Sequence, residues 1–387
     1  MRCLIILKGS DDAKKEDWIK DENLENYYIE INTFYKLYST PELVSPGIER
    51  VGRSFSNLVF QRFYEALILR LGKGGLIVVN LGNDTIKNVE KLAKIHGYQV
   101  FYKVFDQSGE DISADSIIID TYSDLLDWWD REEFILPVRS NDGILHISDI
   151  HSNVTLWRKI INDNRKNHKY LVCHGDYIDG PEKGGSYKMI EAIVGSNNPN
   201  WFWLEGNHEL RLRRYLGWKM FGLGGSKVIS DILFSLVPED FLETTGKEFE
   251  HLTFSGAQSL LVSLNKKLKT HIVLSDEKSV YICTHAGIRF IEQLNPKNIG
   301  SVIYGDHYVD KQDQEFSKLY QESSIISIHA HCKYMPFWNP KKYSKVLNID
   351  PVDESEVVFL SNKKNRLNYV VKKSSNYSKC EKISSRA

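Results

Sequence analysis

An apolar run ends directly at two carboxylates in the stretch Tyr170-Leu171-Val172-Cys173-His174-Gly175-Asp176-Tyr177-Ile178-Asp179. Four more short apolar runs occur in the same part of the chain, at Ile144–Ser148, Trp201–Leu204, Val280–Thr284 and Ile325–Ile328. Runs of this length, most of them followed at once by polar residues, are typical of buried strands that end at a loop. They predict a parallel or mixed sheet whose carboxyl-end loops carry the chemistry.

Polar clusters follow these runs in order, and together they offer the ligand types of a metal site. The clusters are Asp149-Ile150-His151, Gly175–Asp179, Gly206-Asn207-His208-Glu209, His285-Ala286-Gly287 and His329-Ala330-His331. Two divalent ions about 3.5–4 Å apart can clamp the oxygens of a phosphoryl group. Such a site needs a carboxylate that bridges the ions, and imidazoles suit Mn, Fe, Zn or Ni. We therefore expect a binuclear metal site, with Gly175 and Gly206 letting the backbone turn tightly.

These clusters resemble the run of D-x-H, G-D-x-x-D, G-N-H-E, H and G-H-x-H in the calcineurin-like metallophosphoesterase superfamily, over residues 144–350. The second and third clusters are most similar to the branch that contains the phosphoprotein phosphatases and the diadenosine tetraphosphatases. The resemblance implies an α/β sandwich with two central sheets flanked by helices. It also implies a phosphoesterase that attacks a phosphate ester with a metal-bridging hydroxide.

Carried over position by position, the resemblance implies two divalent metal ions, with Mn²⁺ as the first candidate and Fe, Zn, Ni or Mg as alternatives. One ion would be held by Asp149, His151 and His331, the other by Asn207, His285 and His329, and both by Asp176. His208 would be the general acid for the leaving oxygen, with Asp179 orienting its ring. The sequence leaves open whether Glu209 is catalytic or supports the site, and we expect a supporting role.

The chain departs from the family pattern at two positions. Gly180 stands where the family often has an arginine that forks onto the phosphate oxygens. Because a diester or cyclic phosphate carries a single negative charge, it would lose less from the missing arginine than a dianionic monoester. Cations that could replace the arginine are Arg211, Arg214, Arg289 and Lys183. Ile328 replaces the glycine before the last histidine pair, which is expected to change packing and not ligation.

Residues 1–138 are predicted to form a separate α/β domain. Segments with apolar residues at helical spacing alternate there with short apolar runs at Cys3–Leu7, Tyr27–Ile31, Leu76–Asn80 and Val100–Phe105. Alternating strands and helices favour a parallel sheet that is covered on both faces. The polar stretch Arg139–Gly143 then marks the boundary to a metallophosphoesterase domain at residues 139–362.

The first domain resembles the P-loop kinase module of polynucleotide kinase–phosphatases, with its chemistry eroded. The loop Gly9–Glu16 keeps Lys15 but lacks the second glycine and the hydroxyl residue of a P-loop. Asn32 and Asn80 stand where the module has aspartates. The resemblance implies a pseudo-kinase without ATP turnover, which would serve docking or regulation. The alternative is an unrelated α/β domain.

The composition is that of a soluble globular protein, with 387 residues, 42% of them hydrophobic and 26% charged. The net charge of -1 gives no case for a polyanion binder from bulk charge. The five cysteines form no C-x-x-C pair, and no apolar run is long enough to span a bilayer. We expect a cytoplasmic location without membrane contact. Residues 363–387 are rich in Lys and Arg and are predicted to be a basic tail.

These observations leave three functions open. The kinase-like domain directs the first hypothesis toward RNA or DNA ends, with an RNA 3′-phosphate or 2′,3′-cyclic phosphate as substrate, which is an argument from domain order. Trp201 and Trp203 could stack on bases there, unless they pack in the core. The second hypothesis is a Ser/Thr phosphoprotein or dinucleotide-polyphosphate phosphatase. The third is a non-catalytic binding protein in which both domains are relics.

Overall fold

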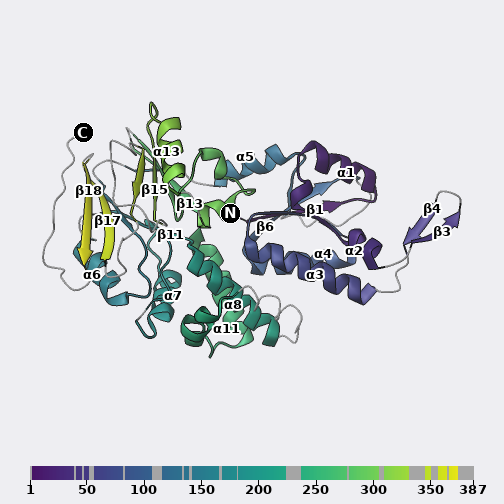
Figure 1. The fold of residues 1–387 in the computed structure, drawn as a ribbon, viewed down its shortest axis with the longest axis horizontal. Coiled ribbons are helices and arrows are strands. Elements are labelled where there is room, and N and C mark those ends of the chain that lie inside the picture. Colours follow the sequence, from purple (N-terminus) through teal and green to yellow (C-terminus); the bar gives the residue numbers. More distant parts are fainter. Residues whose placement is uncertain are drawn as a thin grey trace. The chain divides into compact units, whose positions relative to one another are not determined.

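A computed structural model of the chain contains helices and strands in two compact units (Figure 1). The described residues are 2–38, 41–45, 48–51, 56–81, 83–106, 116–132, 135–138, 142–164, 168–180, 182–223, 237–276, 279–304, 309–330, 345–349, 356–363 and 366–373. The first unit comprises Met1–Trp129, Arg214–Leu236 and Thr253–Val262. The second comprises Asp130–Arg213, Val237–Leu252 and Ser263–Ala387.

The first unit is built on a parallel sheet, as the sequence predicts. Its strand order is β2-β5-β1-β6-β7, and every pair in it is parallel. The strands are β1 (Arg2–Lys8), β2 (Tyr28–Glu30), β5 (Leu76–Asn80), β6 (Tyr98–Val104) and β7 (Ile117–Ile118). All seven residues of β1 are buried, which is typical of a central strand covered on both faces.

Helices cover both faces of this sheet (Figure 1). They are α1 (Asp12–Asp21), α2 (Ile31–Tyr38), α3 (Ser56–Lys73), α4 (Asn83–Ile95) and α5 (Tyr122–Glu132), with a separate hairpin of β3 (Pro41–Ser45) and β4 (Ile48–Val51). In α3, Val59, Phe63 and Leu67 recur at helical spacing and are fully buried. They pack in one core with residues of β1 and β5.

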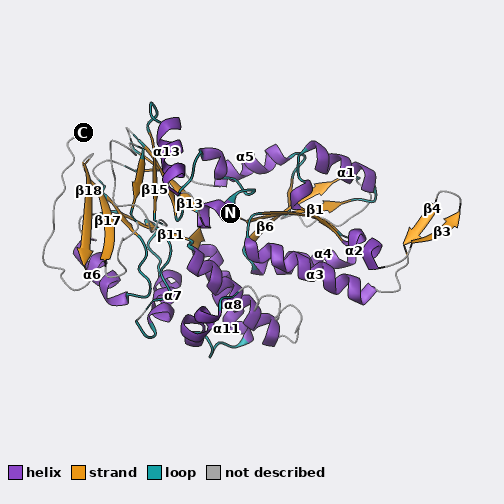
Figure 2. Ribbon diagram, viewed as in Figure 1, coloured by secondary structure: helices purple, strands orange, loops and turns teal. Residues whose placement is uncertain are grey.

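The second unit contains two sheets, which Figure 2 shows in orange between helices. The six-stranded sheet has the order β12-β11-β10-β9-β17-β18, and the five-stranded sheet has the order β16-β15-β14-β13-β8. The strands of the first are β9 (Ile144–Ile147), β10 (Tyr170–Cys173), β11 (Trp201–Leu204), β12 (Leu268–Lys269), β17 (Glu356–Lys363) and β18 (Arg366–Lys373). The strands of the second are β8 (Ile135–Pro137), β13 (His271–Ser275), β14 (Val280–Thr284), β15 (Ile325–His329) and β16 (Val346–Asn348).

One apolar core joins the two sheets of the second unit. Val172 and Leu204 from the six-stranded sheet pack in it with Leu274 and Ile328 from the five-stranded sheet. The helices that lie wholly in this unit are α6 (Val154–Asn164), α7 (Gly185–Gly195), α10 (Glu239–Phe241), α12 (Ile299–Tyr304) and α13 (Val309–Leu319). The helices α8 (Asn207–Leu223) and α11 (Phe254–Lys267) are each divided between the two units. The expected α/β sandwich with two central sheets is therefore present.

The compact units divide the chain differently from the predicted limits of 1–138, 139–362 and 363–387. β8 precedes the predicted boundary at residue 138, yet it pairs in parallel with β13 of the second unit. The predicted tail begins within the six-stranded sheet, because β18 pairs with β17. Residues 374–387 of that tail lie outside the described residues.

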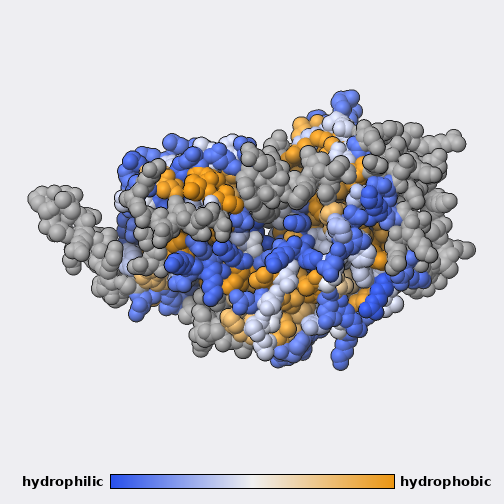
Figure 3. Space-filling model, turned by 180° about the vertical axis from the view of Figure 1, so that it is seen from behind, coloured by the Kyte–Doolittle hydropathy of each residue, from blue (hydrophilic) through white to orange (hydrophobic). Residues whose placement is uncertain are grey.

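Hydrophilic and hydrophobic residues are interspersed on the face that Figure 3 shows. The most exposed large apolar side chains of the described residues belong to different helices, with Leu37 of α2 at 72% and Leu319 of α13 at 62%. None of the described helices combines the length and the apolar character that crossing a membrane requires.

Candidate metal centre

The predicted clusters lie at the carboxyl ends of strands from both sheets of the second unit. Residues 207–209 begin α8, His329 ends β15, and the other clusters lie in the loops that follow β9, β10 and β14. Two of these loops hold unusual backbone, because they contain five of the described non-glycine residues with positive φ. These are Asp149 (48°), His151 (41°), Ser152 (62°), Asp176 (53°) and Asp179 (65°). Left-handed backbone at non-glycine residues is costly and is concentrated at functional sites.

Two glycines allow the loops to approach one another, as the sequence predicts. A Cβ at Gly175, whose φ is +98°, would lie 2.7 Å from Nδ1 of His285. A Cβ at Gly206 would lie 2.2 Å from Oδ1 of Asp176. Any larger residue at either position would therefore push apart the side chains that are expected to share a metal ion.

Asp176, Asn207 and His285 bring acceptor atoms together. Nε2 of His285 lies 3.5 Å from Oδ1 of Asp176 and 3.1 Å from Oδ1 of Asn207. The Asn207 oxygen faces only acceptors, and turning the amide over would let its nitrogen donate to both neighbours. With its oxygen directed toward the site, Asn207 would offer a lone pair to a cation beside those of Asp176 and His285.

Asp149 and His151 form the next pair of predicted ligands, with 3.7 Å between Oδ1 of Asp149 and Nε2 of His151. Nδ1 of His151 lies 3.2 Å from the carbonyl oxygen of Ile178, to which it donates. Burial alone would lower the pKa of His151, but the hydrogen bond and charge of Asp149 raise it to about 10. A metal ion that replaced the Nε2 proton would meet the same negative charges.

His329 is held by a carboxylate that the sequence motifs do not reveal. Nε2 of His329 lies 3.1 Å from Oδ1 of Asp313, which is 1% exposed on α13. The carboxylate accepts the Nε2 proton, so Nδ1 keeps its lone pair. That Nδ1 atom is buried and has no hydrogen-bond partner among the described residues. A carboxylate on the far nitrogen is the usual support of a metal-binding histidine.

The donor set fits divalent metal ions. It combines carboxylates, an amide oxygen and imidazoles, and two of its buried atoms, Oδ2 of Asp149 and Nδ1 of His329, have no partner in the described part of the chain. His151, Asp176 and His208 also bring ligand atoms within 4.8 Å of one another. His331, the remaining predicted ligand, lies outside the described residues.

Glu209 holds two of the loops together. Its fully buried carboxylate accepts hydrogen bonds from the backbone N–H groups of Asp176 (2.9 Å), Tyr177 (2.9 Å) and Gly206 (2.9 Å). Burial and the nearby charge of Asp176 raise the pKa of Glu209 to about 7. These bonds give Glu209 the supporting position that the sequence analysis expects.

His208 and Asp179 form a hydrogen-bonded pair at the start of α8. Nδ1 of His208 donates to Oδ2 of Asp179 over 2.9 Å, and Nε2 points toward Oδ2 of Asp176 at 3.7 Å. Oδ1 of Asp179 accepts from Thr245 over 3.0 Å. Burial would raise the pKa of Asp179, but the bond and charge of His208 hold it below its ordinary value. The pair can therefore keep a proton directed into the site.

The missing arginine has a structural cause. A Cβ at Gly180 would lie 1.7 Å from the carbonyl oxygen of His151, so this loop conformation excludes every larger residue. Arg211 is the predicted cation that lies beside His208 and Asp179, with its guanidinium 3.4 Å from Oδ2 of Asp179. Arg214 donates instead to the carbonyl oxygen of Gly72 (3.0 Å) within the first unit. Arg289 lies near Glu315, at 3.5 Å.

The sequence model of the calcineurin-like phosphoesterase family matches residues 143–353, which include every loop described above. The chain belongs to this family. This phosphoesterase is accordingly a metal-dependent hydrolase whose family centre holds two metal ions. None of the curated protein sequences compared with it matches.

Solved structures with detectable likeness include two phosphatases. A cold-active protein-tyrosine phosphatase from a psychrophilic Shewanella species has a TM-score of 0.38 and 13% identity, over 65% of this chain and 83% of that one. A protein serine/threonine phosphatase from Saccharomyces cerevisiae has a TM-score of 0.36 and 12% identity, over 61% of this chain and 79% of that one. The family assignment rests on the sequence match alone.

We expect Asp313→Asn to weaken metal binding by about 10- to 100-fold, because the amide keeps the shape of the side chain but removes the charge that supports His329. Equilibrium dialysis against Mn²⁺ measures this affinity. Glu315→Gln, two residues further along α13, is the matched control and should leave the affinity unchanged. Equal affinities for Asp313→Asn and the wild type would show that the carboxylate does not support a ligand.

Proposed function

We propose that this phosphoesterase hydrolyses phosphodiesters at nucleic-acid ends, with the 2′,3′-cyclic phosphate of RNA as the first candidate substrate and Mn²⁺ as the first candidate metal. The observation that carries the diester preference is the exclusion of any side chain at Gly180, where a Cβ would lie only 1.7 Å from the carbonyl oxygen of His151. Without a guanidinium there, the site has less positive charge to offset a dianionic monoester. A diester carries one negative charge and needs less positive charge in the site to offset it.

The roles of the side chains follow from their positions. Bound by the ligands described above, two divalent ions would supply a hydroxide nucleophile at neutral pH and neutralise charge on the phosphate. Asp176 lies 3.5 Å from His285 of one predicted ligand group and has a ligand atom within 4.8 Å of one of His151 of the other, so it would contact both ions. His208 would donate its Nε2 proton to the leaving oxygen, while Asp179 accepts the Nδ1 proton and fixes the ring. Arg211 would bind a phosphate oxygen.

Side chains at the carboxyl ends of the strands in the first unit support the proposal that this unit is a pseudo-kinase. Nζ of Lys15, which is buried, lies 3.1 Å from Oδ1 of Asp12 and 3.0 Å from Oδ1 of Asn80. The Asn80 amide donates to Glu30 over 3.1 Å. Lys15 and Asn80 thus form hydrogen bonds with side chains of the same unit. The carboxylates of Asp12 and Glu30 would repel phosphates. We infer that this unit docks or regulates without ATP turnover.

Base stacking on the two predicted tryptophans is not part of the proposal. Trp201 is half-buried, and its ring lies 6.4 Å from those of Trp157 and Trp203. Trp203 is 2% exposed, and its ring lies 5.4 Å from that of Tyr177 and 6.1 Å from that of Trp157. These edge and tilted contacts are those of core aromatics. The nucleic-acid substrate therefore rests on the likeness of the first unit to an end-healing kinase module.

Hydrolysis of bis-p-nitrophenyl phosphate and of p-nitrophenyl phosphate, measured with Mn²⁺, tests the substrate class. The proposal predicts faster cleavage of the diester, and then conversion of an RNA 2′,3′-cyclic end to a monophosphate. Faster cleavage of the monoester would contradict it and favour a phosphoprotein or dinucleotide-polyphosphate phosphatase. A chain that binds metal but cleaves neither these esters nor cyclic RNA ends would favour a binding protein.

Arg211→Gln is expected to lower kcat/KM for the diester by about 10- to 100-fold, because a charge-assisted hydrogen bond to the phosphate is lost. Arg158→Gln, at an exposed position on α6, is the control and should behave as the wild type. Steady-state kinetics at saturating Mn²⁺ separate this effect from metal loss. An unchanged kcat/KM in Arg211→Gln would remove the arginine from the phosphate site.

A further inference from the structure

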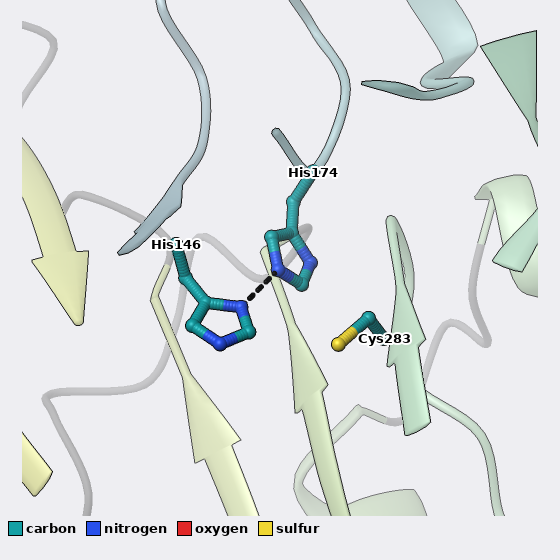
Figure 4. Close-up of side chains that lie close together, drawn as sticks. All are labelled: His146, His174 and Cys283. Atoms are coloured by element: carbon teal, nitrogen blue, oxygen red, sulfur yellow. Dashed lines mark hydrogen bonds between the residues drawn. The ribbon is translucent and has the colours of Figure 1, made fainter. Parts of the chain in front are cut away.

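A buried histidine pair lies beneath the metal-binding loops, and Figure 4 shows it beside Cys283. His146 belongs to β9, His174 follows β10, and Cys283 belongs to β14 of the other sheet. The three residues are at most 1% exposed. The strands that carry them lead directly into the loops of Asp149, Asp176 and His285, three of the predicted metal ligands.

The hydrogen bonds of His174 have a determined direction. Nδ1 of His174 lies 2.8 Å from the carbonyl oxygen of Thr284, which can only accept, so Nδ1 carries the proton. In the neutral ring, Nε2 is then an acceptor. His146 Nδ1, 3.0 Å away, donates to it, as the dashed line in Figure 4 marks. His146 thus fixes the tautomer with which His174 reaches the opposite sheet.

A second hydrogen bond runs between the same two loops in the other direction. Nδ1 of His285 lies 2.6 Å from the carbonyl oxygen of His174, to which it donates. Nε2 of His285 is thereby left with its lone pair facing Asp176, at 3.5 Å. The two hydrogen bonds are therefore reciprocal. The His174 ring donates to the backbone of Thr284, and the His285 ring donates to the backbone of His174.

We infer that His174 is a positioning residue. Its two hydrogen bonds to the Thr284–His285 segment link the two sheets and hold His285 at metal-binding distance from Asp176. Each of these two ligands comes from a different sheet, so their separation depends on how the sheets meet. The reciprocal bonds act at the carboxyl ends of β10 and β14, one residue from His285 and two from Asp176. The inference rests on the metal centre of this phosphoesterase, but not on its proposed substrate.

The same cluster has the composition of a metal site, since His146, His174 and Cys283 bring ligand atoms within 4.8 Å. Two observations favour the positioning role of His174 over metal binding by this cluster. The nitrogens that an ion would need face each other in a hydrogen bond, and the remaining ring nitrogen of His174 is bonded to Thr284. The cluster also includes no carboxylate, so a divalent ion with one thiolate would leave net positive charge in a fully buried place, which is costly.

The test compares variants that differ in the atoms they place at residue 174. The amide nitrogen of asparagine can occupy the position of histidine Nδ1, whereas the longer glutamine side chain reaches the position of Nε2 instead. His174→Asn therefore keeps a donor for the Thr284 carbonyl, and His174→Gln and His174→Leu lose it. Cys283→Ala is the matched control, because it changes the same buried cluster without touching either hydrogen bond.

Mn²⁺ affinity of the full chain is the measurement, read from the signal of free Mn²⁺ in electron paramagnetic resonance. We expect a loss of about 10- to 100-fold in His174→Gln and His174→Leu, and recovery to within about threefold of the wild type in His174→Asn. Thermal unfolding in the presence of a chelator measures stability separately. If His174→Leu does not fold, the comparison of the Asn and Gln variants decides.

Equal loss of affinity in His174→Asn and His174→Gln would overturn the inference, because packing and not the hydrogen bond would then matter. Unchanged affinity in all three variants would overturn it as well. A third equivalent of metal in the wild type, lost in Cys283→Ala, would also overturn the inference and would show that the cluster is a buried metal site. Failure of the proposed diester activity would leave these affinities untouched, so the two proposals fail separately.

Discussion

Asp176→Asn is expected to abolish metal binding and turnover together. The Asp176 carboxylate is 2% exposed and lies 3.5 Å from Nε2 of His285, the nitrogen that would face a metal ion, and 3.7 Å from Nε2 of His208, the expected proton donor. An amide there has no charge to offset two divalent ions and offers one oxygen instead of two. We therefore expect bound Mn²⁺ and diester hydrolysis to fall to the background level.

The fold should survive this substitution, because Glu209 accepts hydrogen bonds from the backbone N–H groups of Asp176 and Tyr177. The Asp176 carboxylate accepts the backbone N–H of His208 over 3.2 Å, and the amide oxygen of asparagine can still accept it. Circular dichroism and thermal unfolding in a chelator check that point. Asp21→Asn, at an exposed position on α1, is the control for the chemical change. An Asp176→Asn variant that kept full metal content would show that the bridging position has been misassigned.

His208→Ala is expected to keep its metal and to slow turnover by about 10²- to 10⁴-fold, the usual contribution of a positioned general acid. The Nδ1 bond to Asp179 at 2.9 Å supports this role, while the grouping of His208 with His151 and Asp176 leaves metal ligation as the competing role. Metal content and rate, measured on the same sample, separate the two. His251→Ala, at an exposed position, is the control.

The leaving group gives a sharper readout of the same role. An aryl leaving group of low pKa departs with little protonation, whereas an alkyl or ribose oxygen needs a proton in the transition state. The rate loss in His208→Ala should therefore increase as the pKa of the leaving alcohol rises. A constant loss across the series, or a loss of metal, would contradict the general-acid assignment.

The strands and most of the site could be predicted from the sequence because both depend on local pattern. The apolar run Tyr170–Cys173 ends in the structure where Gly175 and Asp176 begin the loop, and β1 and β5 form at the predicted runs. Parallel strands bring their carboxyl ends to one edge, which explains why clusters within the same sheet lie close together. The packing of the two sheets brings the two groups of clusters together. The family match over residues 143–353 confirms the predicted family, while the roles of the individual site residues stay predictions.

Contacts between distant elements could not be predicted in this way. Asp313 lies on α13 outside every motif, and only the packing of that helix brings it to His329. The exclusion of a side chain at Gly180 depends on the path of the backbone at His151, which no spacing encodes. The strand β18 was not predicted, because the many lysine and arginine residues led to the prediction of a basic tail. A count of charges does not reveal whether polar and apolar residues alternate, as they do along a strand.

Metal stoichiometry tests the central claim most directly. The metal-free chain is titrated with Mn²⁺ while free Mn²⁺ and hydrolysis of bis-p-nitrophenyl phosphate are followed together. The two-metal centre predicts two equivalents bound per chain, hydrolysis that depends on both, and loss of hydrolysis when a chelator is added. Full hydrolysis in the presence of the chelator, or with no equivalent bound, would contradict it.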